Sequence, residues 1–209
     1  LNDLRDPLLE DVMLPPVRVP AGAVALDRNH LVEQSIRYLA REPERHLYNW
    51  MSRSATYFPM IEQILREEGV PDELKYLAMV ESALNPRARS RVGASGLWQF
   101  MPATGREYGL QVTHWVDERW DPEKSTRAAA RYLRDLYKQF GDWHLAMAAY
   151  NCGPGRVARA KKQFEAGGGK ARFWDIYERL PRETRNYVPM FIAAAIVSSD
   201  PAAFDLRAP

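Results

Sequence analysis

Segments with apolar residues at helical spacing begin at proline or aspartate and end at glycine in this chain, as a series of helices does. Pro71 precedes the segment DELKYLAMVESAL, Asp142 precedes WHLAMAAYN, and Gly69 follows an earlier segment of this kind. Proline and aspartate suit the start of a helix, whereas glycine readily takes the left-handed conformation that follows the last turn. Strand signals of period two with flanking hairpin turns are scarce. The sequence therefore predicts an all-α fold, built mostly of short helices.

The same signals divide the chain into segments. Pro15, Pro16 and Pro20 interrupt the first 27 residues, which have no helical period. We expect an extended N-terminal arm over 1–27, a helical domain over 28–200 and a tail over 201–209. Within the domain we expect helices capped by Asp27 and running to about Ala40, opened by Pro43, opened by Pro59 and ended by Gly69, and covering 71–84, 125–140, 142–151 and 182–198.

The composition excludes several classes of protein. A net charge of +2 over 209 residues is too weak for a nucleic-acid surface. Cys152 is the only cysteine, so neither an intrachain disulfide nor a cysteine metal cluster can form. The spacing of the histidines is not that of metal ligands: they are His30, His46, His114 and His144. No apolar run reaches the length of a membrane span. We expect a monomer without metal or cofactor.

One carboxylate stands among apolar residues at helical spacing. On a helix over 71–84, a single stripe holds Leu74, Leu77, Ala78 and Leu84, with Glu81 in its middle. A buried glutamate is often paired with an arginine or anchors a loop amide. A glutamate near the end of a buried helix can also face a cleft, where burial raises its pKa toward the range of a general acid.

The segment that follows Glu81 is suited to form the wall of such a cleft. Residues 90–102, SRVGASGLWQFMP, combine flexible glycines with hydroxyls, an amide and the apolar side chains of Trp98, Phe100 and Met101. Sugar rings have apolar faces and polar rims, so this mixture fits a carbohydrate. A glycine-rich turn around a core tryptophan is the alternative interpretation. Downstream, AKKQFEAGGGKARF is basic and glycine-rich, which favours a solvated loop over a mobile lid.

Four motifs in order, VESALNP, SRVGASGLWQFMPATG, AAYNCGPGRV and ETRNYVP, resemble those of the family 1 lytic transglycosylases of bacterial cell-wall metabolism. GLWQFMPATG followed by REYGL looks most like the membrane-bound D-type branch of that family. The resemblance covers roughly residues 45–195, with a transglycosylase core over about 60–198. It implies a lysozyme-like α-helical fold, that of goose-type lysozyme and of the soluble lytic transglycosylase catalytic domains.

The resemblance also implies a reaction on peptidoglycan glycan strands. Family members cleave the β-1,4 bond between N-acetylmuramic acid and N-acetylglucosamine without water, because the muramic C6 hydroxyl closes on C1 and gives a 1,6-anhydro product. One glutamate serves as acid and then as base, and Glu81 matches it. Residues matching the family's substrate-binding positions are Ser90, Gly96, Gln99, Met101, Tyr150, Asn151, Glu183 and Tyr187.

The resemblance implies a place in the cell as well. It predicts a periplasmic protein, with a lipid anchor in the outer membrane and repeats of the LysM type as options that lie outside these residues. Trp98 stands where soluble relatives commonly have methionine, and Cys152 where small residues are common. The family needs no thiol, so Cys152 puts no catalytic step in doubt.

Other functions stay open on the residues alone. A glycosidase with two carboxylates needs a second acid, and Asp117, Asp121 and Asp142 look like turn or capping residues. Glu183 lies in the first turn of its helix, where the helix dipole alone favours a carboxylate. A hydrolase like goose-type lysozyme would use Glu183 or Asp121 to hold a water. A catalytically silent wall-binding domain is the third hypothesis.

Overall fold

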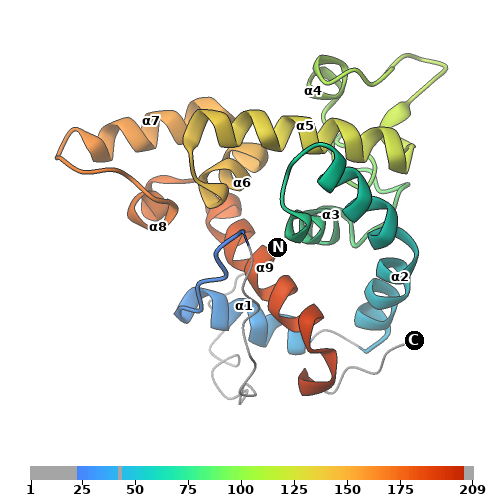
Figure 1. The fold of residues 1–209 in the computed structure, drawn as a ribbon, viewed down its shortest axis with the longest axis horizontal. Helices are drawn as coiled ribbons and strands as arrows, with labels where there is room; N and C mark the ends of the chain where they lie inside the picture. The colour runs from blue at the N-terminus through green and yellow to red at the C-terminus, as the bar shows by residue number, and fades with distance from the viewer. Residues whose placement is uncertain (1–22, 42–43, 205–209) are drawn as a thin grey trace.

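A computed structural model describes residues 23–41 and 44–204 (Figure 1). The nine α-helices in these ranges are α1 (His30–Ala40), α2 (Glu44–Glu67), α3 (Lys75–Ser82), α4 (Pro102–Glu107), α5 (Pro122–Phe140), α6 (Trp143–Cys152), α7 (Pro154–Glu165), α8 (Phe173–Ile176) and α9 (Arg182–Ser199). Short 3₁₀ segments cover Asp72–Leu74, Glu118–Trp120, Tyr177–Arg179 and Pro201–Phe204. Over the described ranges, β pairing is limited to three isolated bridges, so the predicted all-α class is confirmed.

Several predicted helix boundaries are confirmed by their capping atoms. The Asp142 carboxylate accepts from the Leu145 amide at the start of α6, and Gly141 ends α5 with a φ of 66°. The left-handed Gly69, with a φ of 71°, follows α2. The interruption of the helix at Gly153 and Pro154 separates α6 from α7, as the sequence predicts.

Other boundaries were predicted wrongly. Pro59 lies inside α2 and does not open a helix; it is exposed, so the carbonyl that its ring leaves unbonded is on the solvent side. Asn29, not Asp27, caps α1 by accepting from Leu31 and Val32. Asp121 caps α5 four residues before the expected start at Ser125. Residues 160–165, expected as part of a solvated loop, form the C-terminal half of α7.

The predicted arm and tail lie mostly outside the described residues. The part of the arm that is described, residues 23–27, is non-helical and runs over the body of the protein. The Ala23 amide donates to Glu73, the Ala25 carbonyl lies 2.7 Å from His144 Nε2, and Trp174 Nε1 donates to Asp27 at 3.2 Å. Three separate elements therefore hold this segment against the helices.

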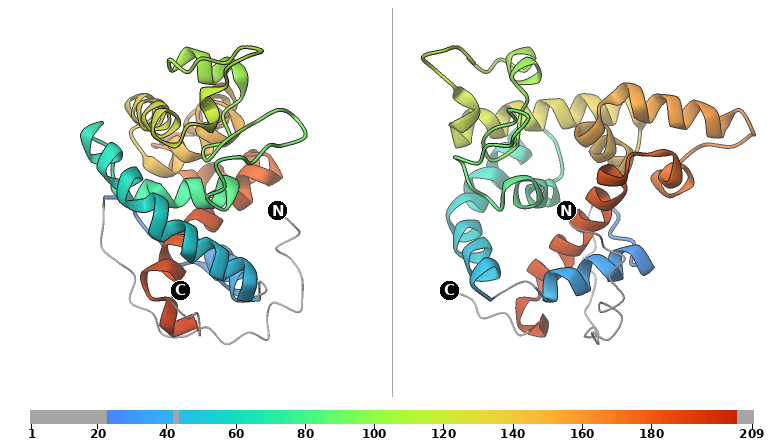
Figure 2. Two further views of the ribbon diagram at one scale, coloured as in Figure 1. Left: turned by 90° about the vertical axis from the view of Figure 1, so that its right-hand side faces the viewer. Right: turned by 180° about the vertical axis from the view of Figure 1, so that it is seen from behind.

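Helix α9 is the centre of the apolar core. Every residue from Tyr187 to Val197 is buried, so the helix is covered all round rather than on one stripe. It packs against α1, α3 and α6, and Figures 1 and 2 show it running from the centre of the molecule to its lower edge. Ala193, Ala194 and Ala195 are small enough to let neighbouring backbones approach closely. Its N-terminal turns thereby come to lie beside the ends of α3 and α6.

Candidate active site

A cleft of about 1190 Å³, open to solvent, lies where the C-terminal ends of α3 and α6 meet the N-terminal turn of α9. Its fourth side is the segment between α3 and α4, residues 83–101, which we call the cleft loop. The residues that line it are Glu81, Ser90, Val92, Ala94, Gln99, Phe100, Met101, Thr104, Tyr132, Tyr150, Asn151, Gly153 and Glu183. Most predicted site residues are therefore brought together on one surface.

Glu81 lies in the last turn of α3, behind the apolar face formed by Leu77 and Ala78, which are fully buried. Tyr187 of α9 donates its hydroxyl to Glu81 Oε1 at 2.7 Å. Burial raises the Glu81 pKa to about 7, the Tyr187 hydrogen bond opposes that shift, and the charge of Glu183 adds to it. Near neutral pH this carboxyl group can therefore both release and accept a proton.

Helix α3 ends earlier than the sequence predicts. Ala83 and Leu84 both have left-handed backbones, with φ of 52° and 57°, so Leu84 reaches the core after the helix rather than on its stripe. The Ser82 hydroxyl donates to the Leu97 carbonyl at 2.9 Å. Glu81 therefore stands one residue from the point where the cleft loop turns back across the helix end.

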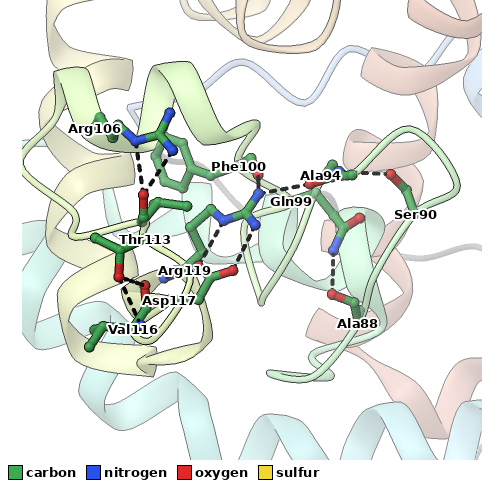
Figure 3. Close-up of polar contacts among 12 residues, drawn as sticks. Ala88, Ser90, Ala94, Gln99, Phe100, Arg106, Thr113, Val116, Asp117 and Arg119 are labelled. Carbon is green, nitrogen blue, oxygen red and sulfur yellow. Dashed lines mark hydrogen bonds and ion pairs between the residues drawn. The ribbon is translucent and has the colours of Figure 1, made fainter.

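Gln99 and Gly96 shape the cleft loop in different ways. Gln99 has a left-handed φ of 48°, and its side-chain Nε2 donates to the Gly96 carbonyl at 2.8 Å. The same nitrogen donates to the Ala88 carbonyl at 3.3 Å (Figure 3). Its Oε1 is the atom that stays available to a ligand. Gly96 does not line the cleft: a Cβ there would stand 1.8 Å from the Arg119 carbonyl oxygen.

The outer wall of the cleft is partly apolar. Met101 and Val92 expose 42% and 76% of their surface, and Phe100 lines the cleft from a buried position. Ser90 closes a turn by accepting from the Ala94 amide at 2.9 Å. The wall offers contact area to a ligand without a net charge of its own.

Tyr150 and Asn151 come from the last turn of α6. Tyr150 donates to the Trp98 carbonyl at 2.7 Å, which ties the end of α6 to the cleft loop. Burial raises the pKa of the Tyr150 hydroxyl well above its usual value, so it stays protonated. The buried Thr184 hydroxyl of α9 donates to Asn151 Oδ1 at 2.7 Å, which leaves the Asn151 NH₂ group to face the cleft.

Trp98 does not provide the sugar-stacking surface that the sequence suggested. Its side chain is fully buried, and its Nε1 donates to the Thr126 hydroxyl at 2.9 Å. An indole of this size in a well-packed interior contributes to the core rather than to a ligand surface. The alternative interpretation is therefore confirmed for Trp98, which belongs to the core, whereas the rest of the segment forms a wall of the cleft, as predicted.

Arg119 is the structural residue that sequence reasoning missed. Its guanidinium makes a two-bond pair with Asp117 and donates to the carbonyls of Gly93 at 2.7 Å and Phe100 at 2.8 Å (Figure 3). Asp117 in turn has a pKa held below its usual range by Arg119. Only 6% of Arg119 is exposed, so this buried side chain supports the cleft loop from behind by hydrogen bonds to its carbonyls. Nothing local in DERWDP distinguishes a buried arginine from an exposed one.

The remaining acidic candidates divide clearly. Asp117, Asp121 and Asp142 cap the helical segments that follow them, as predicted. Glu183 is exposed and lines the same cleft as Glu81. Over the described residues, no group of three or more His, Cys, Asp or Glu side chains is placed to hold a metal ion. In the same residues, no helix is long and apolar enough to cross a membrane.

Comparison with solved structures identifies the fold. The 70 kDa soluble lytic transglycosylase of Escherichia coli aligns with a TM-score of 0.59 over 88% of this chain and 37% of that one, at 24% identity. The lytic transglycosylase Slt of Pseudomonas aeruginosa aligns with a TM-score of 0.55 and 29% identity, over 69% of this chain and 24% of that one. The structure is therefore a lysozyme-like all-α fold.

Comparison of sequences identifies the family. Residues 58–173 match the transglycosylase SLT domain. Membrane-bound lytic murein transglycosylase D of Escherichia coli is 38% identical over 184 residues, which are 88% of this chain and 40% of that protein. Soluble lytic murein transglycosylase of Escherichia coli is 36% identical over 56% of this chain and 19% of that protein. The chain belongs to the family 1 lytic transglycosylases, and spans well under half the length of these relatives.

Proposed function

We propose that this domain is a peptidoglycan lytic transglycosylase that cleaves the β-1,4 bond between N-acetylmuramic acid and N-acetylglucosamine. The observation that carries the proposal is Glu81, a carboxyl group with a pKa of about 7 on the wall of a cleft of about 1190 Å³. The printed names of the relatives support it, because they describe murein transglycosylases. The Pseudomonas structure is described as an inactive mutant in which a glutamate is replaced by glutamine, which fits a glutamate-dependent reaction in that enzyme.

The proposed reaction has two proton transfers through one residue. Protonated Glu81 gives its proton to the glycosidic oxygen as the bond from C1 to that oxygen breaks. The Glu81 carboxylate then takes the proton of the muramic C6 hydroxyl, whose oxygen bonds to C1 and closes the 1,6-anhydro ring. No water is consumed, and Glu81 ends the cycle protonated. A pKa near the working pH suits both halves of this cycle.

The neighbours of Glu81 have separate tasks in this proposal. Tyr187 donates to Glu81 Oε1, so it orients the carboxyl group and stabilises its charged form. The Asn151 NH₂ group and Gln99 Oε1 supply one donor and one acceptor to the sugar rims, and Met101 and Phe100 cover the ring faces. Ser90 and Tyr150 lie on the same wall.

A hydrolase is the second candidate, because Glu183 lines the same cleft. In that reaction Glu183 would hold a water against C1 while Glu81 protonates the leaving oxygen. The two candidates differ in the mass of their products. Transglycosylation leaves the muramic acid end lighter by one water than hydrolysis does, and the N-acetylglucosamine end is the same in both.

The deciding experiment is mass spectrometry of purified peptidoglycan after digestion. We expect anhydromuramyl ends from the parent protein, and a rate about 10³-fold lower for Glu81→Gln, because a general acid contributes a factor of about 10²–10⁴. Glu183→Gln is the matched control, which should keep the anhydro product. Hydrated reducing ends that disappear in Glu183→Gln would replace the transglycosylase with a hydrolase. Binding to the wall without products would leave a silent binding domain.

The location of the full protein belongs to this proposal. The printed names of the relatives include membrane-bound and soluble proteins, which is consistent with an enzyme of the bacterial envelope. We place it in the periplasm, with anchoring to the outer membrane as the arrangement to test by fractionating cells that express the full-length gene. Its partner there is the peptidoglycan glycan strand.

A further inference from the structure

Helix α7 presents two unlike faces. Val157 and Ala160 are buried against the body of the protein. Arg156, Arg159 and Lys162, spaced three residues apart, are exposed on the other side. At three residues per step, these cations form one slowly turning row along the helix. We call this row the α7 cationic face.

The α7 segment carries a net positive charge. The chain has 29 Lys and Arg against 27 Asp and Glu, yet residues 154–172 contain six cations and one carboxylate. The rest of the chain therefore has more carboxylates than cations. A solvated helix in such a chain is expected to carry both signs. The α7 segment instead forms a positive region on an otherwise slightly negative protein.

The nearby carboxylates do not neutralise the α7 cationic face. Glu165 is held by Lys161 and by the Ala171 amide, and Asp175 pairs with Arg172. In the described part of the chain, Arg156, Arg159 and Lys162 have no salt bridge. Arg127, Arg131 and Arg134 of α5, by contrast, share Glu67 and Glu68. The exposed Arg87, Arg89 and Arg91 of the cleft loop resemble the α7 cations, because no salt bridge holds them in the described residues.

The α7 cationic face begins at the cleft. Gly153 lines the cleft and is followed at once by α7, whose twelve residues extend about 18 Å. Figures 1 and 2 show α7 projecting from the body on the side away from α4. Arg156 lies in the first turn, close enough to influence the Cys152 thiol, and Lys162 lies near the far end. The α7 cationic face therefore starts next to the cleft and leads away from it.

We infer that the α7 cationic face binds the carboxylates of the peptide stems that peptidoglycan carries on its muramic acid units. This inference rests on the proposed function, because it takes the glycan strand as the ligand of the cleft. Guanidinium groups bind carboxylates through two parallel hydrogen bonds. Each exposed pair contributes little alone, so the row acts through several weak contacts and is sensitive to salt.

The test compares Arg156→Gln/Arg159→Gln with Arg41→Gln/Arg66→Gln, a control that removes the same charge from the C-terminal ends of α1 and α2. Each protein is assayed on intact strands and on strands whose peptide stems have been removed by an amidase. We expect the α7 variant to lose about fivefold in kcat/KM on intact strands only, and the control to lose nothing. In roughly 1 M salt, where the Debye length is about 3 Å, the loss should vanish.

Three results would overturn the inference. They are an equal loss on stripped strands, no loss on either substrate, or an equal loss in the control variant. Circular dichroism melts show that both variants are folded before the assays are compared.

Direct binding separates this inference from the proposed function. If the parent protein releases no anhydro product, binding of a fluorescent soluble stem peptide still tests the α7 cationic face. Weaker binding by the α7 variant than by the control keeps the inference while the proposed function falls. Unchanged peptide binding, with loss of binding to vesicles of anionic lipid, would assign the face to a membrane surface and overturn it.

Discussion

The core around α9 and the cleft loop are held together by different forces. Residues 187–197 of α9 are buried among apolar side chains, whose packing is non-directional and tolerates swaps of similar volume. The cleft loop has little regular structure, and its carbonyls at Gly93, Gly96, Leu97, Trp98 and Phe100 each accept from a side chain. The site lies at the border of the two regions. Its geometry therefore depends on a few directional bonds that stand on a robust core.

The largest effect is expected at Gly96, where the loop backbone touches Arg119. In Gly96→Ala the new Cβ collides with backbone rather than with a flexible side chain, at a φ of 84°. We expect a loss of about 4 kcal/mol in the free energy of unfolding, measured by urea denaturation. Gly141→Ala is the control: its φ is also positive but its Cβ meets nothing, so about 1 kcal/mol is expected. Equal losses would refute the close approach.

The next test removes the Arg119 side chain, which supports the cleft loop. Arg119→Met leaves Asp117 and two loop carbonyls without their donor, so we expect a loss of about 3 kcal/mol together with most of the activity. Ile192→Val in α9 should cost about 1 kcal/mol and leave activity unchanged. The prediction is contradicted if both variants lose activity in the same proportion to their loss of stability.

The pH dependence of stability gives a second test of Arg119→Met. Asp117 has a depressed pKa in the folded state, so its ion pair stabilises the protein above the carboxyl's ordinary pKa and is lost as the pH falls through the depressed value. The parent should therefore lose stability in acid more steeply than Arg119→Met. Melting temperatures of the parent and of Arg119→Met, measured over roughly pH 3 to pH 7, would show this difference in acid sensitivity.

A smaller effect is expected from Tyr187→Phe. The lost hydrogen bond had stabilised the charged form of Glu81, so the pKa of Glu81 should rise further above about 7. Because the proposed acid works protonated, the alkaline limb of the kcat/KM profile should move to higher pH. We expect about tenfold lower kcat at neutral pH, since the carboxyl group also loses its orientation. An alkaline limb that stays in place would separate Tyr187 from the titration of Glu81.

The smallest effect is expected at Thr184, which touches Asn151 and not the cleft. Thr184→Val keeps the shape but frees Asn151 to turn, so we expect about fivefold lower kcat/KM. Thr184→Ser should restore most of the rate. In a double-mutant cycle with Asn151→Ala, the two losses should not add. Additive losses would mean that Thr184 acts through another residue.

Much of the fold could be predicted because local signals and packing agree. Asp142, Gly141 and Gly69 specify helix ends through atoms within a few residues, so those ends were found. Pro59 misled the prediction, because an exposed proline within a long helix is tolerated when neighbouring turns hold the helix together. Asp121 and Ser125 can both cap a helix, and only the surrounding loop selects between them.

The candidate site was predicted where residue type and position coincide. Glu81 was found because a carboxylate interrupts an apolar stripe, whereas its partners came from the resemblance to a family. Trp98 and Arg119 could not be placed, because their burial depends on contacts with Thr126, Gly93 and Phe100 that only the folded chain brings near. Long-range hydrogen bonds leave no period in a sequence.

The bond between Tyr187 and Glu81 has a consequence for the order of folding. It joins residues 106 positions apart, so closing it costs the entropy of a long loop. Helix α9, which supplies Tyr187 and packs on α3, lies far beyond α3 in the sequence. Until α9 docks, Glu81 lacks both the Tyr187 hydroxyl and the part of its burial that α9 provides. The raised pKa of the proposed catalytic group is therefore a property of the completed fold and not of α3 by itself.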